Sequence, residues 1–447
     1  MPKILFMEIF LFILYFVLFS WMLGKLSFFK DIPGLSYKML LLFFVLKVMA
    51  GISMILVYTH IYELEIADFH KYFRDGMILY GVLKESPIDF LRIITGIQAS
   101  AENLATYYDQ MDFWNRPWES PVYNDNRVVI RFNALAAVFS FGSIYIHNIF
   151  INFLSLSGLV AIYKFILRFA DKDKIFWLPL GIFLFPGLLF WGSGILKEGL
   201  LIWAFGYWML YTDEIFSRKY FRFSFLFYFA FFSFLLFLLK PYALALWLPC
   251  MVGFYLSRDY KPIKIIFSYI MSFAVFFIIM LMVGWVFPKY DFIQIIVSKQ
   301  NNFVNHALAL DAGSIIHTKY LETNFLNLFV EFWRGLGYSL FRPHPFEAYS
   351  VVVAFAVLEN MLIWGMLLST LFYFDRQGIS KYPLFWLGLF YVILLFGFVG
   401  MVAPLHGAIV RYKIPALPFL WVFWIHMTRL PATEKIKKNK LWKFFNK

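Results

Sequence analysis

Charged side chains are scarce in this sequence, and cysteine is almost absent. Only 15% of the 447 residues are Asp, Glu, Lys or Arg, while 62% are hydrophobic, and the mean hydropathy is +0.72. A soluble fold of this length cannot bury so much apolar surface, because large hydrophobic cores split into domains rather than grow. A lipid bilayer can solvate that surface instead. The scarcity of charge therefore excludes an ordinary soluble domain and predicts an integral membrane protein.

The single cysteine, Cys250, excludes an internal disulfide and a metal site built from several thiolates. Acidic residues are also few, since 27 Asp and Glu stand against 40 Lys and Arg, which gives a formal net charge of +13. In a soluble protein this excess would suggest a nucleic-acid partner. Here much of the basic charge lies in short loops between apolar runs, where it sets topology and contacts anionic lipid. We therefore expect membrane lipid, and no nucleic acid, as a partner.

Apolar runs of roughly 16–25 residues predict an all-α polytopic fold with about eleven transmembrane helices in one domain, residues 1–447. The predicted spans are residues 4–23, 38–59, 144–167, 175–192, 194–212, 221–239, 242–257, 264–287, 350–374, 384–403 and 409–428. No small-residue cleavage site follows the first run, so we interpret it as a span rather than a signal peptide. The shorter segment 128–142 is interpreted as an interfacial or re-entrant helix.

Six short basic groups fall on the same side of the membrane if there are eleven spans. They are Lys25/Lys30/Lys38, Arg168/Lys172/Lys174, Arg218/Lys219/Arg222, Arg258/Lys261/Lys264, Arg376/Lys381 and the Lys residues of the tail 429–447. The positive-inside rule makes this side cytoplasmic. We therefore expect the N-terminus outside and the C-terminus in the cytoplasm. The richness in Phe and Lys suggests a bacterial protein of the inner (plasma) membrane.

Two long loops, residues 60–143 and 288–349, are then predicted on the outer face. Long loops are often functional. The first of them contains apolar positions at helical spacing, which predicts amphipathic helices lying along the membrane surface.

The candidate site consists of ionisable residues near the outer ends of the predicted spans, because charge at membrane level is costly and is therefore a functional candidate. The residues are Asp68, His70 and Arg74, then Lys197 and Glu198, Lys240, Arg342 and His344, and finally His406 and Arg411. Lys and Arg match phosphate oxygens, and Asp or His can accept a proton from a hydroxyl group. The helix that begins beyond Gly192 and Gly194 adds an N-terminus suited to an anion.

A divalent cation held by Asp68 and Glu65 is an alternative use of the acidic segment. No other metal or cofactor is indicated. Each candidate also has a structural explanation: Asp68, His70 and Arg74 could form a surface ion-pair network, and Lys240 and Arg411 could extend to lipid headgroups. For Lys47, His147 and Glu359 we expect structural partners inside the protein.

Three segments resemble the GT-C class of integral-membrane glycosyltransferases, especially protein-mannosyltransferase-like and lipopolysaccharide glycosyltransferase-like members. ADFHKYFRDG is similar to the acidic motif of the first outer loop. LFPGLLFWGSGILKEGLLIWAFGYWMLY is similar to a proline-containing helix followed by a small-residue turn and a Lys-Glu pair. RYKIPALPFLWVF matches a late Arg-Tyr-x-x-Pro-x-x-Pro pattern.

The resemblance implies a sugar donor linked to polyprenyl phosphate, a glycan, lipid or protein acceptor at the outer face, and inversion at the anomeric carbon. It implies that Asp68 is the general base and that His70 supports either Asp68 or the acceptor. Lys197, Arg342 and Arg411 would bind the donor phosphate.

A polysaccharide polymerase for O-antigen or capsule shares much of this layout. A transporter or flippase of lipid-linked glycans and a non-catalytic scaffold are further alternatives. Transporters usually carry internal repeats, broken helices and polar groups at the bilayer midplane. The candidate residues here gather at one face, which favours an enzyme that assembles cell-surface glycan.

Overall fold

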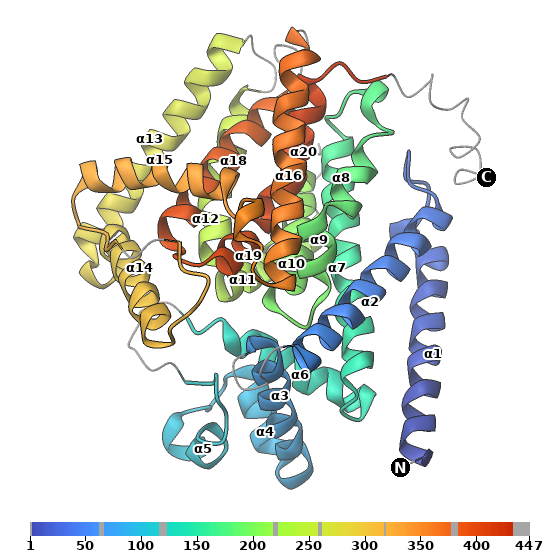
Figure 1. The fold of residues 1–447 in the computed structure, drawn as a ribbon. Helices are drawn as coiled ribbons and strands as arrows, with labels where there is room; N and C mark the ends of the chain where they lie inside the picture. Colours follow the sequence, from blue (N-terminus) through green and yellow to red (C-terminus); the bar gives the residue numbers. More distant parts are fainter. Residues whose placement is uncertain are drawn as a thin grey trace. The chain divides into compact units, whose positions relative to one another are not determined.

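The computed structural model describes residues 2–61, 67–115, 123–217, 222–257, 262–316, 319–376 and 383–431. Within these ranges the regular structure is helical, with three isolated β-bridges (Figure 1). The described residues form two compact units, which are treated separately below. Residues 2–164 and 189–241 belong to the first unit, and residues 165–188 and 242–431 belong to the second.

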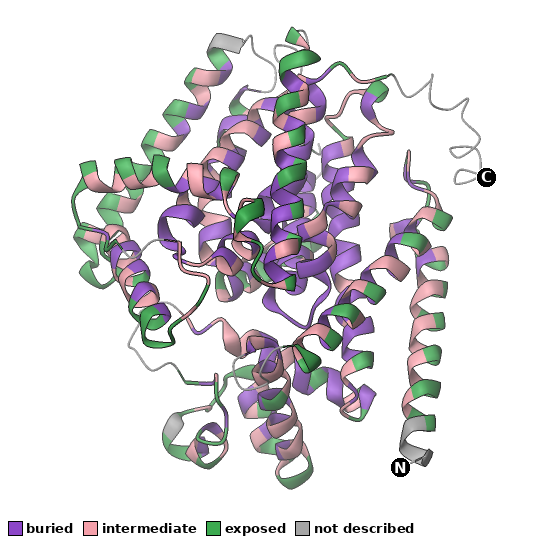
Figure 2. Ribbon diagram, viewed as in Figure 1, coloured by how far each residue is buried: buried purple, intermediate pink, exposed green. Residues whose placement is uncertain are grey.

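The first unit is built around the buried helix α7. Its elements are α1 (Pro2–Lys25), η1 (Ser27–Phe29), α2 (Tyr37–His60), α3 (Asp68–Glu85), α4 (Pro87–Thr95), α5 (Ala101–Tyr108), α6 (Asn126–Ser140), α7 (Ile144–Leu167), η3 (Trp191–Ser193), α10 (Lys197–Ser217) and α11 (Phe223–Leu239). Of the apolar window of α7, 78% is buried, against 6% for α1 (Figure 2). The exposed residues of α1 are nevertheless large and apolar, among them Phe6, Phe10 and Trp21, as expected for a helix in contact with lipid.

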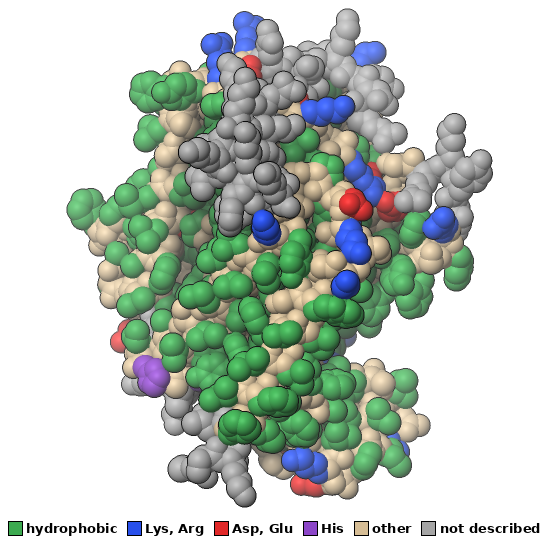
Figure 3. All heavy atoms as spheres, turned by 90° about the vertical axis from the view of Figure 1, so that its right-hand side faces the viewer, with side chains coloured by type: hydrophobic (Ala, Val, Ile, Leu, Met, Phe, Trp, Pro, Cys, Tyr) green, Lys and Arg blue, Asp and Glu red, His purple; other side chains and the backbone are tan. Residues whose placement is uncertain are grey.

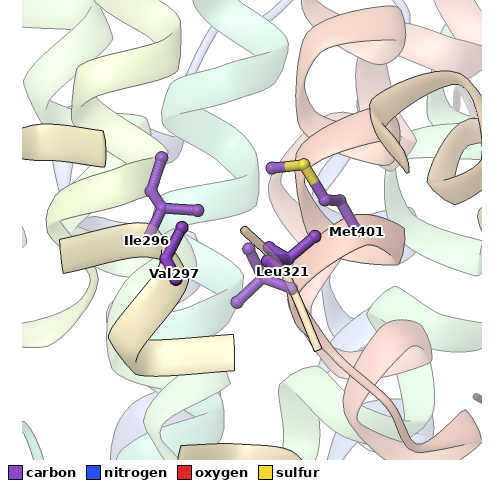
Figure 4. Packing of buried hydrophobic residues seen from close by; sticks show 5 residues of the cluster. Ile296, Val297, Leu321 and Met401 are labelled. Atoms are coloured by element: carbon purple, nitrogen blue, oxygen red, sulfur yellow. The ribbon is translucent and has the colours of Figure 1, made fainter. Parts of the chain in front are cut away.

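The second unit contains the later helices. Its elements are η2 (Lys172–Lys174), α8 (Leu178–Leu184), α9 (Pro186–Phe190, which continues into the first unit), α12 (Pro241–Ser257), α13 (Pro262–Val286), η4 (Pro288–Tyr290), α14 (Phe292–Ala309), α15 (Phe325–Phe341), η5 (Pro345–Glu347), α16 (Val351–Phe372), α18 (Pro383–Val402), α19 (His406–Tyr412), η6 (Ile414–Ala416) and α20 (Leu417–Met427). Helices α15 and α18 pack against each other along their lengths. Five buried side chains attach α14 to the end of α18 (Figure 4): Ile296, Val297, Leu321, Met401 and Val402.

The described helices confirm a polytopic helical protein but correct the expected number of eleven spans. Six described helices are long and apolar enough to cross a membrane, or up to eight if each bent helix pair is one span. The six are Phe6–Lys25, Tyr37–His60, Ile144–Leu167, Lys264–Val286, Val351–Phe372 and Pro383–Val402. Each coincides within a few residues with a predicted span. Hydrophobic side chains also dominate the face drawn in Figure 3.

The remaining predicted spans are broken or short. The segment 175–192 is interrupted at Phe185, which is extended (ψ 128°) because Pro186 follows it. The helices Pro186–Ser193 and Lys197–Ser217 then meet at an angle of 113°, since the chain leaves the helical conformation at Gly194 (ψ 163°). The predicted span 409–428 is bent by 40° where Pro415 interrupts the helical hydrogen bonds.

Helices α11 and α12 replace the predicted spans 221–239 and 242–257. Each has 17 residues. At 1.5 Å per residue such a helix reaches about 26 Å, which is shorter than the hydrocarbon core of a typical bilayer, about 30 Å. A count based on hydropathy alone therefore gives too many full spans.

The two segments predicted as outer loops contain helices. Residues 60–143 include α3 to α6, and residues 288–349 include α14 and α15. Neither α4 nor α5 is long enough to cross a membrane, with nine and eight residues. Helix α4 follows a cap in which the Ser86 hydroxyl accepts from the Asp89 N–H, and it ends at Gly96, which has a positive φ of 80°.

Candidate functional site

Lys197 and Lys240 converge on one carboxylate in the first unit. The Nζ atom of Lys197 lies 2.8 Å from Oδ2 of Asp125, and the Nζ atom of Lys240 lies 3.2 Å from the same oxygen. The side chains of Lys197, Lys240 and Asp125 are only 8%, 7% and 17% exposed. Two cations thus share one anion in a nearly buried group, which we call the lysine–aspartate cluster.

The antiparallel pair α10–α11 brings the two lysines together. Lys197 is the first residue of α10, and Lys240 directly follows the last residue of α11, so both lie at the same end of the pair. The helices pack against each other, and the indole N–H of Trp208 donates to the Ser233 hydroxyl across them (2.7 Å). The lengths of the two apolar helices therefore bring together two lysines that are 43 positions apart in the chain.

Asp125 joins the cluster from the start of α6. It precedes the helix at the N-cap position, yet its side chain makes no capping hydrogen bond. Aspartate at this position normally accepts a backbone N–H of the first turn. The carboxylate interacts with the lysines instead, and this interaction compensates part of the cost of burying two ammonium groups.

Asp68 and Tyr72 of α3 lie near the same lysine. The charges that act on Lys197 include those of Asp125, Lys240 and Asp68. The Lys197 ammonium also lies 5.4 Å from the centre of the Tyr72 ring, whose hydroxyl donates to Asn126 at the start of α6 (3.0 Å). Close packing of α3 and α6 brings these groups together. The starts of α3, α6 and α10 therefore contribute to one polar region.

A buried polar network holds the turn that precedes Lys197. The Lys47 ammonium of α2 donates to the Gly192 carbonyl (3.0 Å) and to the Ser193 hydroxyl (3.1 Å). From α7, Ser155 donates to the Gly192 carbonyl and Asn152 to the Ser193 carbonyl (2.8 and 2.9 Å). The expected structural partner of Lys47 is thereby confirmed. Because the network fixes η3, it also fixes where α10 and Lys197 begin.

The other residues of the acidic segment have partners of their own. The Nε2 atom of His70 lies 3.2 Å from the Tyr58 carbonyl at the end of α2, and Arg74 forms an ion pair with Asp112. Burial lowers the pKa of His70, although the hydrogen bond to Tyr58 partly offsets this effect. The structure therefore places His70 against α2 and Arg74 against the segment that follows α5.

Asp75, which was not a candidate, is fully buried on α3. Its carboxylate accepts the backbone N–H groups of Asp112 (3.0 Å) and Phe113 (2.8 Å). Burial raises its pKa, and these two hydrogen bonds offset only part of the effect. Asp75 therefore anchors the chain that leads toward Asp125.

In the second unit, Arg342, His344 and His406 surround Glu347. The Arg342 guanidinium donates to Oε1 through Nε (2.9 Å), and the backbone N–H of His344 donates to Oε2 (2.9 Å). The Nε2 atoms of His344 and His406 lie 3.6 and 3.7 Å from the carboxylate. Burial raises the pKa of Glu347, but the hydrogen bonds from Arg342 and His344 and the nearby positive charges outweigh it, so the pKa is lowered.

The remaining candidates lie in α10 and α19. Glu198 is buried in the first turn of α10, and Arg411 is in the last turn of α19. The nearby residue Lys413 is fully buried and pairs with Glu359 of α16 (3.0 Å). Glu359 thus has the structural partner that was expected for it, as has His147, which contacts Asn133 (2.9 Å).

Six of the ten candidate residues therefore fall into two groups. The first unit brings Asp68, Lys197 and Lys240 together, and the second unit brings Arg342, His344 and His406 together. The sequence analysis missed the central carboxylate of each group, Asp125 and Glu347. One signal was present for Asp125, since it stands three residues before the predicted helix 128–142 in a run of polar residues.

Among the described residues, no three His, Cys, Asp or Glu side chains lie close enough together to hold a metal ion. Glu65, the expected partner of Asp68 in a cation site, lies outside the described residues, as do Glu63, the basic residues Arg218, Lys219, Arg258, Lys261 and Lys381, and the tail from residue 432. Comparison of the chain with protein-family models, with curated proteins and with solved structures gives no match.

Proposed function

We propose that this chain is a membrane glycosyltransferase that transfers a sugar from a polyprenyl-phosphate-linked donor to an acceptor at the outer face of the membrane. The lysine–aspartate cluster carries the proposal. Two buried ammonium groups at the end of an apolar helix pair suit a phosphate whose lipid tail lies along hydrophobic helices. A cation at the start of α10 is also unfavourable for that helix unless an anion offsets it.

In the proposed reaction, an acceptor hydroxyl attacks the anomeric carbon of the donor sugar. The bond between this carbon and the phosphate oxygen breaks, and the lipid phosphate leaves with the bonding electrons. Lys197 and Lys240 stabilise the negative charge that grows on the leaving phosphate. Asp68 accepts the hydroxyl proton, which fits the electrostatic interaction of its carboxylate with Lys197. The roles of Arg342 and Arg411 in donor binding remain predictions from the family resemblance.

The distribution of basic residues in the first unit supports the outer face. Lys25 is the last residue of α1, Lys30 lies between α1 and α2, and Arg222 directly precedes α11. The chain places these residues at the helix ends opposite to the end of α2, the start of α10 and the end of α11. By the positive-inside rule the basic ends face the cytoplasm, so the lysine–aspartate cluster faces outward.

The test uses the full chain in nanodiscs, a panel of undecaprenyl-phosphate-hexose donors and native cell membranes as the source of acceptor. Release of undecaprenyl phosphate is measured. We expect release by the wild type, and a loss of at least about a hundredfold in Asp68→Asn, because removal of a general base typically costs about 10²–10⁴ in rate.

The matched control is Asp109→Asn, because Asp109 is an exposed aspartate just after α5. This variant should keep the wild-type rate. Full activity of Asp68→Asn would remove Asp68 from the reaction. Failure of the wild type to release lipid phosphate from any donor in the panel would overturn the glycosyltransferase.

A transporter of lipid-linked glycans is the second candidate, because one observation favours it. The helices Pro186–Ser193 and Lys197–Ser217 form a broken pair with a bend of 113°, and a lysine stands at the start of the second half. Broken helices whose half-helix N-termini face anionic groups are typical of transporters. Reconstitution in sealed vesicles distinguishes the two functions, since a transporter moves the donor across the vesicle membrane without releasing lipid phosphate.

A further inference from the structure

The charge of the lysine–aspartate cluster limits the kind of phosphate it can take. We propose that Asp125 makes this site selective for a single phosphate group, as in a polyprenyl monophosphate or its sugar diester, against a diphosphate. This inference rests on the proposed function only in assuming that the site binds a lipid phosphate. It names a substrate class and a residue that determines it.

The formal charges in the cluster nearly cancel before any ligand binds. Lys197 and Lys240 contribute two positive charges, Asp125 removes one, and the Asp68 carboxylate acts on Lys197 as a second negative charge. The starts of α3, α6 and α10 add a partial positive charge of about one half each. The excess positive charge is therefore between one and two units, which matches a phosphodiester with one negative charge or a phosphate monoester with about 1.5 to 2 negative charges. A polyprenyl diphosphate with a free terminal phosphate carries about three negative charges and would leave at least one of them uncompensated in a nearly buried place.

Asp125 can remain in place while a phosphate binds. An ammonium group has three N–H donors, so each lysine can hold a carboxylate oxygen and a phosphate oxygen at the same time. Departure of Asp125 would break two ion pairs, of 2.8 and 3.2 Å, at side chains that are mostly buried. Breaking a buried pair is costly because it leaves a charge without its partner.

The Asp125 carboxylate pairs with the two lysines although its position in the chain would allow it to cap α6. Asp125 stands at the N-cap of α6 but makes no capping hydrogen bond. An asparagine or serine could serve as a cap there equally well. Asp125 differs from such residues in its negative charge. We therefore infer that the site selects its phosphate ligand by charge.

The test compares geranylgeranyl phosphate with geranylgeranyl diphosphate, each binding to the full chain in nanodiscs at pH 7.5. We expect the wild type to bind the monophosphate at least about tenfold more tightly. Asp125→Asn, which adds one net positive charge, should abolish or reverse that preference. Asp125→Glu should keep it, and Lys240→Gln, which changes the charge in the opposite direction, should widen it.

Asp109→Asn removes an exposed carboxylate elsewhere in the same unit and should leave both affinities unchanged. Thermal unfolding of each variant reports whether it is folded. If Asp125→Asn does not fold, the inference is tested by the ratio of the two affinities in the wild type and in Lys240→Gln. Tighter binding of the diphosphate by the wild type, or an unchanged ratio in Asp125→Asn, would overturn this inference alone. Binding of neither compound would overturn the proposed function together with it.

Discussion

At Glu347, two oxygens receive hydrogen bonds from separate parts of the second unit. Arg342 directly follows α15, His344 directly precedes η5, and His406 begins α19, so one carboxylate connects the ends of three elements. The carboxylate side chain is 13% exposed. Hydrogen bonds to a charged group that is mostly withdrawn from water contribute more than those at the surface.

Glu347→Gln should therefore destabilise the protein in a pH-dependent way. At pH 7 we expect a loss of about 1–3 kcal/mol in the free energy of unfolding. Because the pKa of Glu347 is lowered in the folded state, its contribution is present above the unfolded-state value of about 4.3 and is lost as the pH falls through the folded value. Thermal unfolding in detergent from pH 7 to pH 3 checks this. The wild type and the variant should converge at low pH.

Glu322→Gln is the control for this change, since Glu322 is an exposed glutamate of the same unit. Its unfolding curve should follow that of the wild type throughout. A Glu347→Gln variant that stays less stable than the wild type by the same amount at every pH would show that packing, and not charge, makes the difference.

Individual site residues could be predicted from the sequence only where a charged residue interrupts an apolar run. Lys197 and Lys240 are conspicuous because they interrupt apolar runs. Asp125 stands among Asn, Asp and Arg residues in NDNR, where a carboxylate resembles any solvated loop residue. Its partners follow it by 72 and 115 positions in the chain, and only the packing of α6 with α10 and α11 brings them together. No local pattern contains that information.

At the scale of elements, close helix crossings rest on single glycines. Gly335 of α15 faces Gly400 of α18, and a Cβ atom at Gly335 would lie 2.3 Å from the Met401 nitrogen. A Cβ atom at Gly400 would lie 2.0 Å from the Gly335 carbonyl oxygen. Both obstacles are backbone atoms, so the helices themselves would have to separate. Small residues allow this kind of approach between helices in membranes.

Gly335→Ala should lower the stability of the second unit, because the two helices would lose contact along their crossing. We expect a loss of about 1–3 kcal/mol, typical of overpacking. Gly337→Ala is a matched control two positions away on the same helix, where a Cβ atom meets nothing within 4 Å. It should be neutral or stabilising by up to about 1 kcal/mol, because alanine is the better helix former. Thermal unfolding of both variants checks the pair, and equal behaviour would contradict the crossing.

Hydropathy predicts straight helices well and broken ones badly. The span predicted at 144–167 has the same bounds in the structure, and the span predicted at 38–59 differs by one residue at each end. Between 175 and 212 the same method predicts two spans, because apolar residues continue on both sides of the breaks at Pro186 and Gly194. Window averages do not respond to one proline or glycine. Backbone conformation decides there, and it depends on partners such as Lys47 that lie far away in the sequence.

At the scale of the whole molecule, composition shows that the protein lies in a membrane but does not give the number of spans. The average over 447 residues is insensitive to local breaks, so the membrane class follows from it directly. The side on which each segment lies depends on the number of membrane crossings before it. Adding or removing one crossing reverses the side of every later segment. The expected eleven spans and the six to eight candidate spans therefore leave the orientation as a prediction that needs its own measurement.

Cysteine labelling can measure that orientation, because the single native cysteine is buried and gives little background. Lys30→Cys introduces a thiol at an exposed position in the basic segment between α1 and α2, and Asp109→Cys introduces one at an exposed position in the segment between α2 and α7. The segments lie at opposite ends of α2, so they should differ in accessibility. In intact bacterial spheroplasts, a membrane-impermeant maleimide should label Asp109→Cys and should label Lys30→Cys only after permeabilisation.

The opposite pattern would place the lysine–aspartate cluster in the cytoplasm, since Asp68 begins α3 on the same connection between α2 and α7 as Asp109. A donor at the outer face would then be impossible for this site, whatever its chemistry. The wild type supplies the baseline, because label on Cys250 would show that the reagent reaches the interior of the protein. Orientation, measured in this way, decides between an enzyme of the cell surface and one that acts on lipid phosphates in the cytoplasmic leaflet.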